Sequence, residues 1–229
     1  MKLQVVVALC VLFLAVQVYG EEMVLKDQRD KVSYSIGINL GNNFKRQSID
    51  INPDALVQGI KDTLSSGKTL MTEDEIRDTL AAFQKEMLDK QAERMKELGE
   101  KNKKEGETFL SENKKKEGVV TLPSGLQYKV LKEGTGKTPK ATDTVIVNYK
   151  GTLIDGTEFD SSYRRGQSAT FPVNGVIPGW SEALQLMKEG SKWQLFIPSN
   201  LAYGERGAGN IIGPNATLIF EVELISIKQ

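Results

Sequence analysis

The chain has 229 residues, 39% of them hydrophobic and 26% charged, and its 30 basic side chains balance 30 acidic ones. This neutral composition is typical of a globular protein and gives no indication of nucleic-acid binding. Histidine is absent, and the one cysteine is Cys10. Histidine-dependent nucleophilic schemes, zinc sites built on histidine or cysteine, and internal disulfides are therefore excluded. We expect neither a metal site nor a cofactor.

The first twenty residues have the pattern of a secretory signal peptide. Lys2 precedes an apolar run from Val5 to Val16, which is shorter than a membrane span. Val18 and Gly20 occupy the −3 and −1 positions of a cleavage site. We predict that residues 1–20 are a signal peptide and that the protein is exported. An uncleaved N-terminal anchor is the alternative.

Residues 21–70 are predicted to form a small helical domain. Apolar residues recur every four positions in a first stretch, at Val32, Ile36, Leu40 and Phe44. A second helix is predicted to begin at Asn52-Pro53 and has a similar apolar face, at Leu56, Ile60 and Leu64. So few apolar residues bury little area within one chain. We therefore expect the domain to form a homodimer, with a self-contained helical hairpin as the alternative.

Residues 71–117 are predicted to form a long connecting helix. Thr72 and Glu75 have the spacing of a capping box, and good helix formers follow. Between Gly99 and Thr108 there is no large apolar side chain, so this part is either a solvent-exposed helix or a flexible linker. We favour the helix, although Gly99 and Gly106 weaken that prediction near its middle.

Residues 118–229 have the pattern of an α+β domain. Alternating or apolar runs predict strands, at 126–131, 144–149, 193–197 and 217–227. Asp155-Gly156 is typical of a hairpin turn that returns into Glu158. One short helix is predicted over 178–187. The expected fold is an antiparallel sheet wrapped on that helix, preceded by the all-α region and the long helix.

Four segments of this domain, taken in order, resemble the signatures of FKBP-type peptidyl-prolyl cis/trans isomerases. They are Val147 to Ser162, Gly175 to Trp180, Leu201 to Gly204 and Asn215 to Leu224. The rest of the chain resembles one subgroup, the macrophage infectivity potentiator (Mip) proteins. That likeness lies in Asp30 to Asn43, the Asn52-Pro53 helix, the Lys/Glu-rich helix and Leu122 to Val130.

The resemblance implies an enzyme that catalyses rotation about Xaa-Pro bonds in proline-containing client proteins and so assists their folding. It also implies a homodimer in the periplasm or associated with the outer membrane or cell surface, and possible inhibition by the macrolides tacrolimus and rapamycin. Two other functions stay open: a holdase-type chaperone, and a virulence-associated surface binding protein in which isomerase activity is secondary.

The absence of histidine and cysteine suits this reaction. The barrier to peptide rotation is about 18–20 kcal/mol because the C–N bond has partial double-bond character. No covalent bond need break. The twisted transition state loses amide resonance and charge separation, so an apolar pocket that excludes water favours it over the planar amide. An aromatic bowl with a few polar anchors is sufficient.

The resemblance also implies which residues form that bowl. Asp160 would be a buried acidic group facing the twisted amide, Tyr203 would offer its hydroxyl, and Ile177 would donate its backbone N–H. Trp180 would be the floor. The other substrate-binding residues would be Tyr149, Phe159, Arg165, Val176, Ile212 and Phe220, with Arg165 able to pair with Asp160.

Each of these residues also has a purely structural interpretation. Tyr149, Phe159 and Phe220 could be core aromatics on alternating strands. Asp160 could cap the turn at Ser161-Ser162. Ala169 stands where many relatives have a pocket-wall aromatic, and Ala208-Gly209 replace bulkier residues in a loop over the pocket. These departures leave substrate preference and macrolide affinity open.

Overall fold

The computed structural model describes residues 23–65 and 67–228. Along the chain, the boundary between two compact units falls between Glu75 and Ile76. The predicted signal peptide, residues 1–20, lies outside the described residues. Among the residues that are described, no helix is both long enough and apolar enough to cross a membrane.

The first unit contains two short helices, α1 (Gln28–Gln47) and α2 (Pro53–Leu64). The Asp27 carboxylate caps α1 by accepting from the Asp30 N–H at 2.9 Å. The Asn52 side chain caps α2, as the Asn-Pro pattern predicts. No residue described between 23 and 75 is buried. One copy of this unit therefore has no hydrophobic core of its own.

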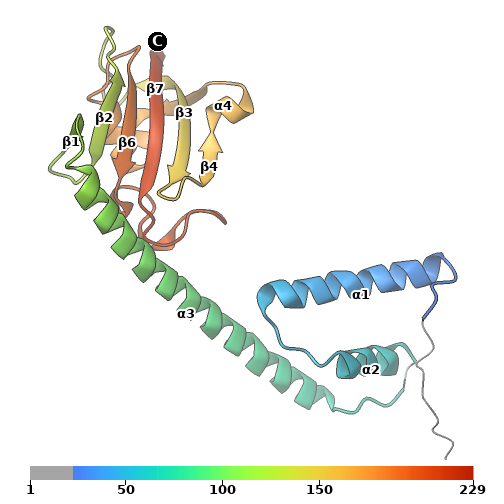
Figure 1. The fold of residues 1–229 in the computed structure, drawn as a ribbon. Coiled ribbons are helices and arrows are strands. Elements are labelled where there is room, and N and C mark those ends of the chain that lie inside the picture. The colour runs from blue at the N-terminus through green and yellow to red at the C-terminus, as the bar shows by residue number, and fades with distance from the viewer. Residues whose placement is uncertain (1–22, 66, 229) are drawn as a thin grey trace, which may run out of the picture. The chain divides into compact units, whose positions relative to one another are not determined.

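A single helix, α3 (Glu73–Asn113), follows α2 (Figure 1). The capping box forms as predicted, because the Thr72 N–H donates to Glu75 Oε2 at 2.8 Å and the Glu75 N–H donates to Thr72 Oγ1 at 3.2 Å. The preference for a helix over a flexible linker is confirmed. The helix ends at Asn113, four residues before the predicted boundary.

The polar part of α3 packs against the C-terminal domain instead of standing free in solvent. The buried residues of the helix are Gly99, Gly106 and Asn113, which recur every seven positions. A Cβ at Gly99 would lie 3.2 Å from Cβ of Pro214, and one at Gly106 would overlap Thr217. The two glycines that weakened the helix prediction therefore allow the close approach of the helix to residues 214–217.

The second unit is built on an antiparallel sheet, which confirms the α+β prediction (Figure 1). The strands lie in the order β1-β2-β6-β7-β3-β4, and β5 pairs with the first half of β3. Their bounds are β1 Val119–Thr121, β2 Gln127–Lys132, β3 Thr144–Leu153, β4 Glu158–Ser161, β5 Ala169–Pro172, β6 Lys192–Ile197 and β7 Leu218–Lys228.

Short helices complete the domain. The predicted helix over 178–187 is α5 (Pro178–Leu184), and a one-turn helix α4 (Ser162–Arg165) follows β4. Three-residue 3-10 turns span Val173–Gly175, Ser199–Leu201 and Gly204–Arg206. The sequence patterns did not predict β1, β5 or α4, because segments of three or four residues are too short to display a period.

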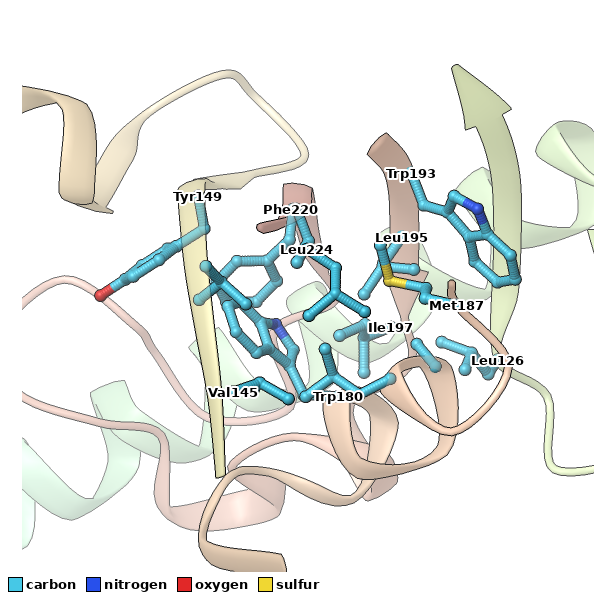
Figure 2. Packing of buried hydrophobic residues seen from close by; sticks show 14 of the residues in the cluster. Leu126, Val145, Tyr149, Trp180, Met187, Trp193, Leu195, Ile197, Phe220 and Leu224 are labelled. Carbon is cyan, nitrogen blue, oxygen red and sulfur yellow. The ribbon is translucent and has the colours of Figure 1, made fainter. Parts of the chain in front are cut away.

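The core lies between one face of the sheet and α5 (Figure 2). Val145, Leu195 and Leu224 are fully buried beneath Leu184 and its neighbours on the helix. Figure 2 shows Tyr149, Trp180 and Phe220 gathered at one end of this core, with the Tyr149 hydroxyl pointing away from the cluster. The aromatic end of the core is thus also the wall of an open pocket.

Candidate active site

The pocket at the aromatic end of the core is lined by Trp180, which three other rings surround. Its volume is about 680 Å³, within the range usual for small-molecule sites. The rings of Tyr149 and Phe220 each lie 5.2 Å from the Trp180 ring, at interplanar angles of 88° and 82°. The Phe171 ring lies 6.0 Å away at 88°. Three rings therefore stand nearly upright around one flat indole.

The far wall of the pocket depends on a glycine in β3. Phe159 and Phe220 meet edge to face, with centroids 5.4 Å apart. A Cβ at Gly151 would lie 2.6 Å from the Phe159 ring and 2.7 Å from the Phe220 ring. Only glycine at this position leaves room for the two rings to meet above the strand.

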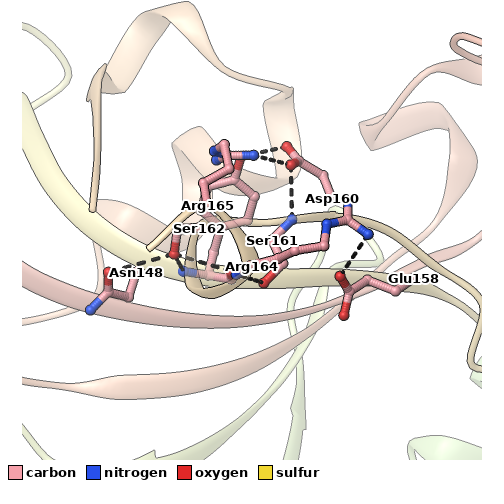
Figure 3. Close-up of polar contacts among 8 residues, drawn as sticks. Asn148, Glu158, Asp160, Ser161, Ser162, Arg164 and Arg165 are labelled. Carbon is pink, nitrogen blue, oxygen red and sulfur yellow. Dashed lines mark hydrogen bonds and ion pairs between the residues drawn. The ribbon is translucent and has the colours of Figure 1, made fainter. Parts of the chain in front are cut away.

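Asp160 lies at the polar side of the pocket in a network with two other side chains (Figure 3). Its Oδ2 accepts from the Tyr149 hydroxyl at 2.5 Å, and its Oδ1 accepts from the Ser161 N–H at 2.8 Å. Arg165 pairs with Oδ1 through Nη1 and donates from Nη2 to the Tyr149 hydroxyl at 2.8 Å. The carboxylate is thereby fixed in direction and balanced in charge.

The network also sets the ionisation of its members. Partial burial opposes ionisation of Asp160, but the hydrogen bonds from Tyr149 and Arg165 hold the pKa of the carboxyl below its usual range. Burial, and then the hydrogen bond to Asp160, raise the pKa of Tyr149. Burial, and then the negative charge of Asp160, raise the pKa of Tyr203. The site at neutral pH therefore holds one carboxylate and two neutral phenols.

Two backbone segments form the rim of the pocket. Val176 and Ile177 precede α5, and within the described chain the Ile177 N–H donates to no protein acceptor. Opposite them, the loop 207–213 contributes Ala208 to Ile212, and a reciprocal backbone pair closes this loop between Ala208 and Ile212, at 2.8 and 3.2 Å. The Tyr203 side chain lines the pocket and is 41% exposed.

The structure brings all ten residues named from the sequence to one place. Nine of them line the pocket directly: Tyr149, Phe159, Asp160, Val176, Ile177, Trp180, Tyr203, Ile212 and Phe220. Arg165 is not among the lining residues, but it forms an ion pair with Asp160, which is. Asp160 is less buried than the resemblance implied, with 39% of its side chain exposed, because the ion pair lies at the pocket edge.

The structural interpretations also apply to some of these residues. Tyr149 and Phe220 are 5% and 4% exposed and belong to the core, so each is both a core aromatic and a pocket wall. Asp160 does accept from the Ser161 N–H, while the Ser161 hydroxyl caps α4 by accepting from the Arg164 N–H at 3.3 Å. One carboxylate thus both shapes a turn and faces the pocket.

Phe171 lines the pocket and was not singled out from the sequence. It lies on β5 two residues after Ala169, so the two side chains share one face of the strand. Ala169 does not line the pocket, and Phe171 provides the aromatic wall of this strand. Its position in the four-residue strand β5 gave no periodic pattern by which to identify it.

The chain matches two protein families over consecutive segments. Residues 29–130 match the domain amino-terminal to FKBP-type peptidyl-prolyl isomerase, and residues 135–225 match the FKBP-type peptidyl-prolyl cis-trans isomerase. The chain is 54% identical to the outer membrane protein MIP of Legionella longbeachae, over 90% of this chain and 88% of that protein. It is 50% identical to the peptidyl-prolyl cis-trans isomerase Mip of Coxiella burnetii, over 90% and 89%.

Among solved structures, the chain is similar to the crystal structure of FkpA from Escherichia coli. The TM-score is 0.74 at 40% identity, and the match covers 90% of this chain and 99% of that chain. The likeness therefore extends through the helical regions as well as the C-terminal domain.

Proposed function

The chain belongs to the FKBP-type peptidyl-prolyl cis-trans isomerases of the Mip and FkpA kind, and we propose that its aromatic pocket catalyses noncovalent rotation about Xaa-Pro bonds in exported client proteins. The observation that carries the assignment of the site is the arrangement of three upright rings around Trp180. A flat indole enclosed on its sides accepts the apolar face of a prolyl ring.

The apolar surroundings lower the rotational barrier by favouring the twisted amide. In water the planar amide is well solvated through its charge separation, and this solvation is lost as the C–N bond rotates. The aromatic walls supply few hydrogen bonds to the planar form, so the ground state is stabilised less than in water. The rotation needs no nucleophile, in keeping with a chain without histidine.

Three groups act as polar anchors around the amide. The Ile177 N–H has no protein acceptor in the part of the chain that is described, and it donates to a carbonyl of the bound peptide. The Tyr203 hydroxyl is kept neutral and also donates. Asp160 presents its carboxylate, fixed by Arg165 and Tyr149, to the side of the pocket where the rotating carbonyl changes orientation. Val176 and Ile212 close the rim.

A protease-coupled assay with a tetrapeptide that contains one Xaa-Pro bond tests the assignment. Trp180→Leu keeps an apolar residue at the floor but removes the flat surface and its three ring contacts. We expect kcat/KM to fall at least about tenfold, since about 1.4 kcal/mol of lost transition-state binding has that effect. Unchanged kcat/KM in this variant would refute the pocket as the site.

The first unit supports a homodimer. Large apolar side chains of α1 and α2 are strongly exposed in one copy, including Ile36 at 56%, Val57 at 47% and Ile60 at 45%. Exposed apolar surface of this kind is stabilised when it is covered, and a second copy of the same unit is the covering surface we propose. The same observation disfavours a self-contained hairpin.

The cellular location and the inhibitors are also part of the proposal. An exported protein of the periplasm or the outer membrane fits the pattern of residues 1–20 and the relative named as an outer membrane protein. Tacrolimus and rapamycin would occupy the prolyl pocket, with Phe171 compensating for Ala169 on the β5 wall. Competition between tacrolimus and the tetrapeptide checks this directly.

A further inference from the structure

A second hollow lies on the other side of the loop that forms the pocket rim. It has a volume of about 530 Å³ and is bounded by α3, by the turn after β3 and by residues 206–217. We call it the α3 groove. Its apolar lining includes Met95 and Leu98 on the helix, Ile154 at the turn and Ile211 on the loop.

The α3 groove lies next to the active-site pocket, across one loop. Four consecutive residues, Gly209 to Ile212, line both hollows. Met95, Leu98 and Ile211 are 41%, 40% and 48% exposed, so an apolar surface lies open beside the loop. A peptide that leaves the pocket across Ile211 therefore meets this surface next.

The charges around the groove favour a neutral occupant. Lys101 and Arg206 are matched in number by Glu105 and Asp155, and Lys101 lies 3.9 Å from Glu105. A rim of balanced charge attracts neither a polyanion nor a strongly charged peptide. The lining instead suits apolar side chains of an unfolded polypeptide.

We propose that the α3 groove is an extended client site, in which apolar residues flanking the proline of an unfolded polypeptide bind while the prolyl bond occupies the pocket. The proposal rests on the isomerase function of that pocket. It adds a binding surface for the residues that flank the proline, outside the pocket itself. It also gives α3 a part in client binding beyond that of a connection.

The test compares two substrates with one variant. Met95→Asp places a charge in the groove but lies outside the pocket. We expect kcat/KM on the tetrapeptide to stay within about twofold, and kcat/KM on refolding of reduced, carboxymethylated ribonuclease T1 to fall about three- to tenfold, the scale of one lost apolar contact. Leu88→Asp, at an exposed apolar position of α3 outside the groove, is the matched control.

Three results would overturn the proposal: unchanged protein refolding in the Met95→Asp variant, an equal loss on both substrates, or an equal loss in the Leu88→Asp variant. If the unaltered protein shows no activity on the tetrapeptide, the isomerase assignment fails instead.

A second measurement avoids the refolding step. Because Cys10 is the one cysteine, the protein without residues 1–20 and carrying Met95→Cys accepts a single photoreactive label. We expect cross-linking to the unfolded ribonuclease there and not with Leu88→Cys; equal cross-linking at both positions contradicts the groove.

Discussion

The Tyr149 hydroxyl donates a 2.5 Å hydrogen bond to Oδ2 of Asp160, and Arg165 binds both partners. Tyr149 is at the same time a wall of the aromatic pocket, with its ring 5.2 Å from Trp180. One hydrogen bond thus joins the apolar part of the site to the carboxylate of Asp160 in its lining. A change at either residue should affect both the position of the ring and the direction of the charge.

The first prediction concerns this carboxylate. Asp160→Asn keeps the shape but removes the charge that Arg165 balances, leaving the guanidinium without its ionised partner. We expect kcat/KM on a tetrapeptide to fall about tenfold, because hydrogen bonds to charged groups contribute about 1.5–3 kcal/mol. Asp143→Asn is the control, since this carboxylate accepts from the Lys140 N–H at 2.8 Å and does not line the pocket. Equal effects of the two variants would contradict a special role for Asp160.

A second prediction follows from the ionisation of the site. The pKa of Asp160 is below its usual range, and burial together with the Asp160 charge raises the pKa of Tyr203. The chain has no histidine, so none of the described residues that line the pocket changes charge between about pH 5 and about pH 9. We expect kcat/KM to vary by less than about twofold over this interval. A bell-shaped profile centred near neutrality would show that another group controls the reaction.

The same depressed pKa gives a stability prediction with a definite sign. A carboxyl whose pKa is lower in the folded than in the unfolded protein, where it is about 3.9, stabilises the fold above the unfolded value. This contribution is lost as the pH falls through the folded pKa. Urea unfolding should therefore show the Asp160→Asn variant less stable than the unaltered protein at pH 7, with the difference shrinking below about pH 4. A difference that grows on acidification would contradict the ion pair.

Much of the fold could be predicted from the sequence because its longer elements display a period. The capping box at Thr72 predicts the start of α3, and the alternation in β3 predicts a strand of the sheet. The contact of α3 with residues 214–217 could not be predicted, because it is made at Gly99 and Gly106. Residues without apolar side chains leave no hydrophobic pattern, although they permit the closest approach.

The residues of the candidate site also separate into those that could be predicted from the sequence and those that could not. The residues carried over from family motifs lie together around the pocket, including Ile177, for which we propose a role of the backbone N–H that no side-chain pattern reveals. Phe171 was missed because β5 is four residues long and pairs only with the start of β3. The α3 groove was missed for a different reason. It joins three segments far apart in the sequence, and no pattern within any one of them reveals that they meet.

A fourth prediction tests whether α3 holds the loop over the pocket. Asn102 Nδ2 donates to the Pro214 carbonyl at 2.8 Å, and Asn215 Nδ2 approaches the Gly99 carbonyl at 3.4 Å. Asn102→Ala removes the shorter contact, which contributes about 1 kcal/mol. We expect hydrogen exchange at the Ile212 N–H to accelerate about fivefold. Lys104→Ala, an exposed change on the same helix, should leave it unaltered; equal acceleration in both variants would mean that the helix does not hold the loop through Asn102.

The last prediction concerns the covering of α1. In one copy Ile36 and Leu40 are 56% and 38% exposed, and no described residue of 23–75 is buried. If a second copy covers this face, a charge placed there must be desolvated on association, which costs several kcal/mol unless it is paired. Ile36→Asp with Leu40→Asp should therefore convert a dimer at micromolar concentration into a monomer in sedimentation velocity. Asn42→Asp adds a charge to the same helix at a polar position and should remain dimeric.

The tetrapeptide kcat/KM distinguishes a loss of dimer formation from a change in the pocket. The described residues that line the pocket all lie between Tyr149 and Phe220 of one chain. The tetrapeptide kcat/KM of the double variant should therefore match that of the unaltered protein. A monomeric mass for the unaltered protein at micromolar concentration would refute the dimer. A tetrapeptide kcat/KM that falls with the dimer would instead show that the second copy contributes to the pocket. Such a contribution would contradict a site built within one C-terminal domain.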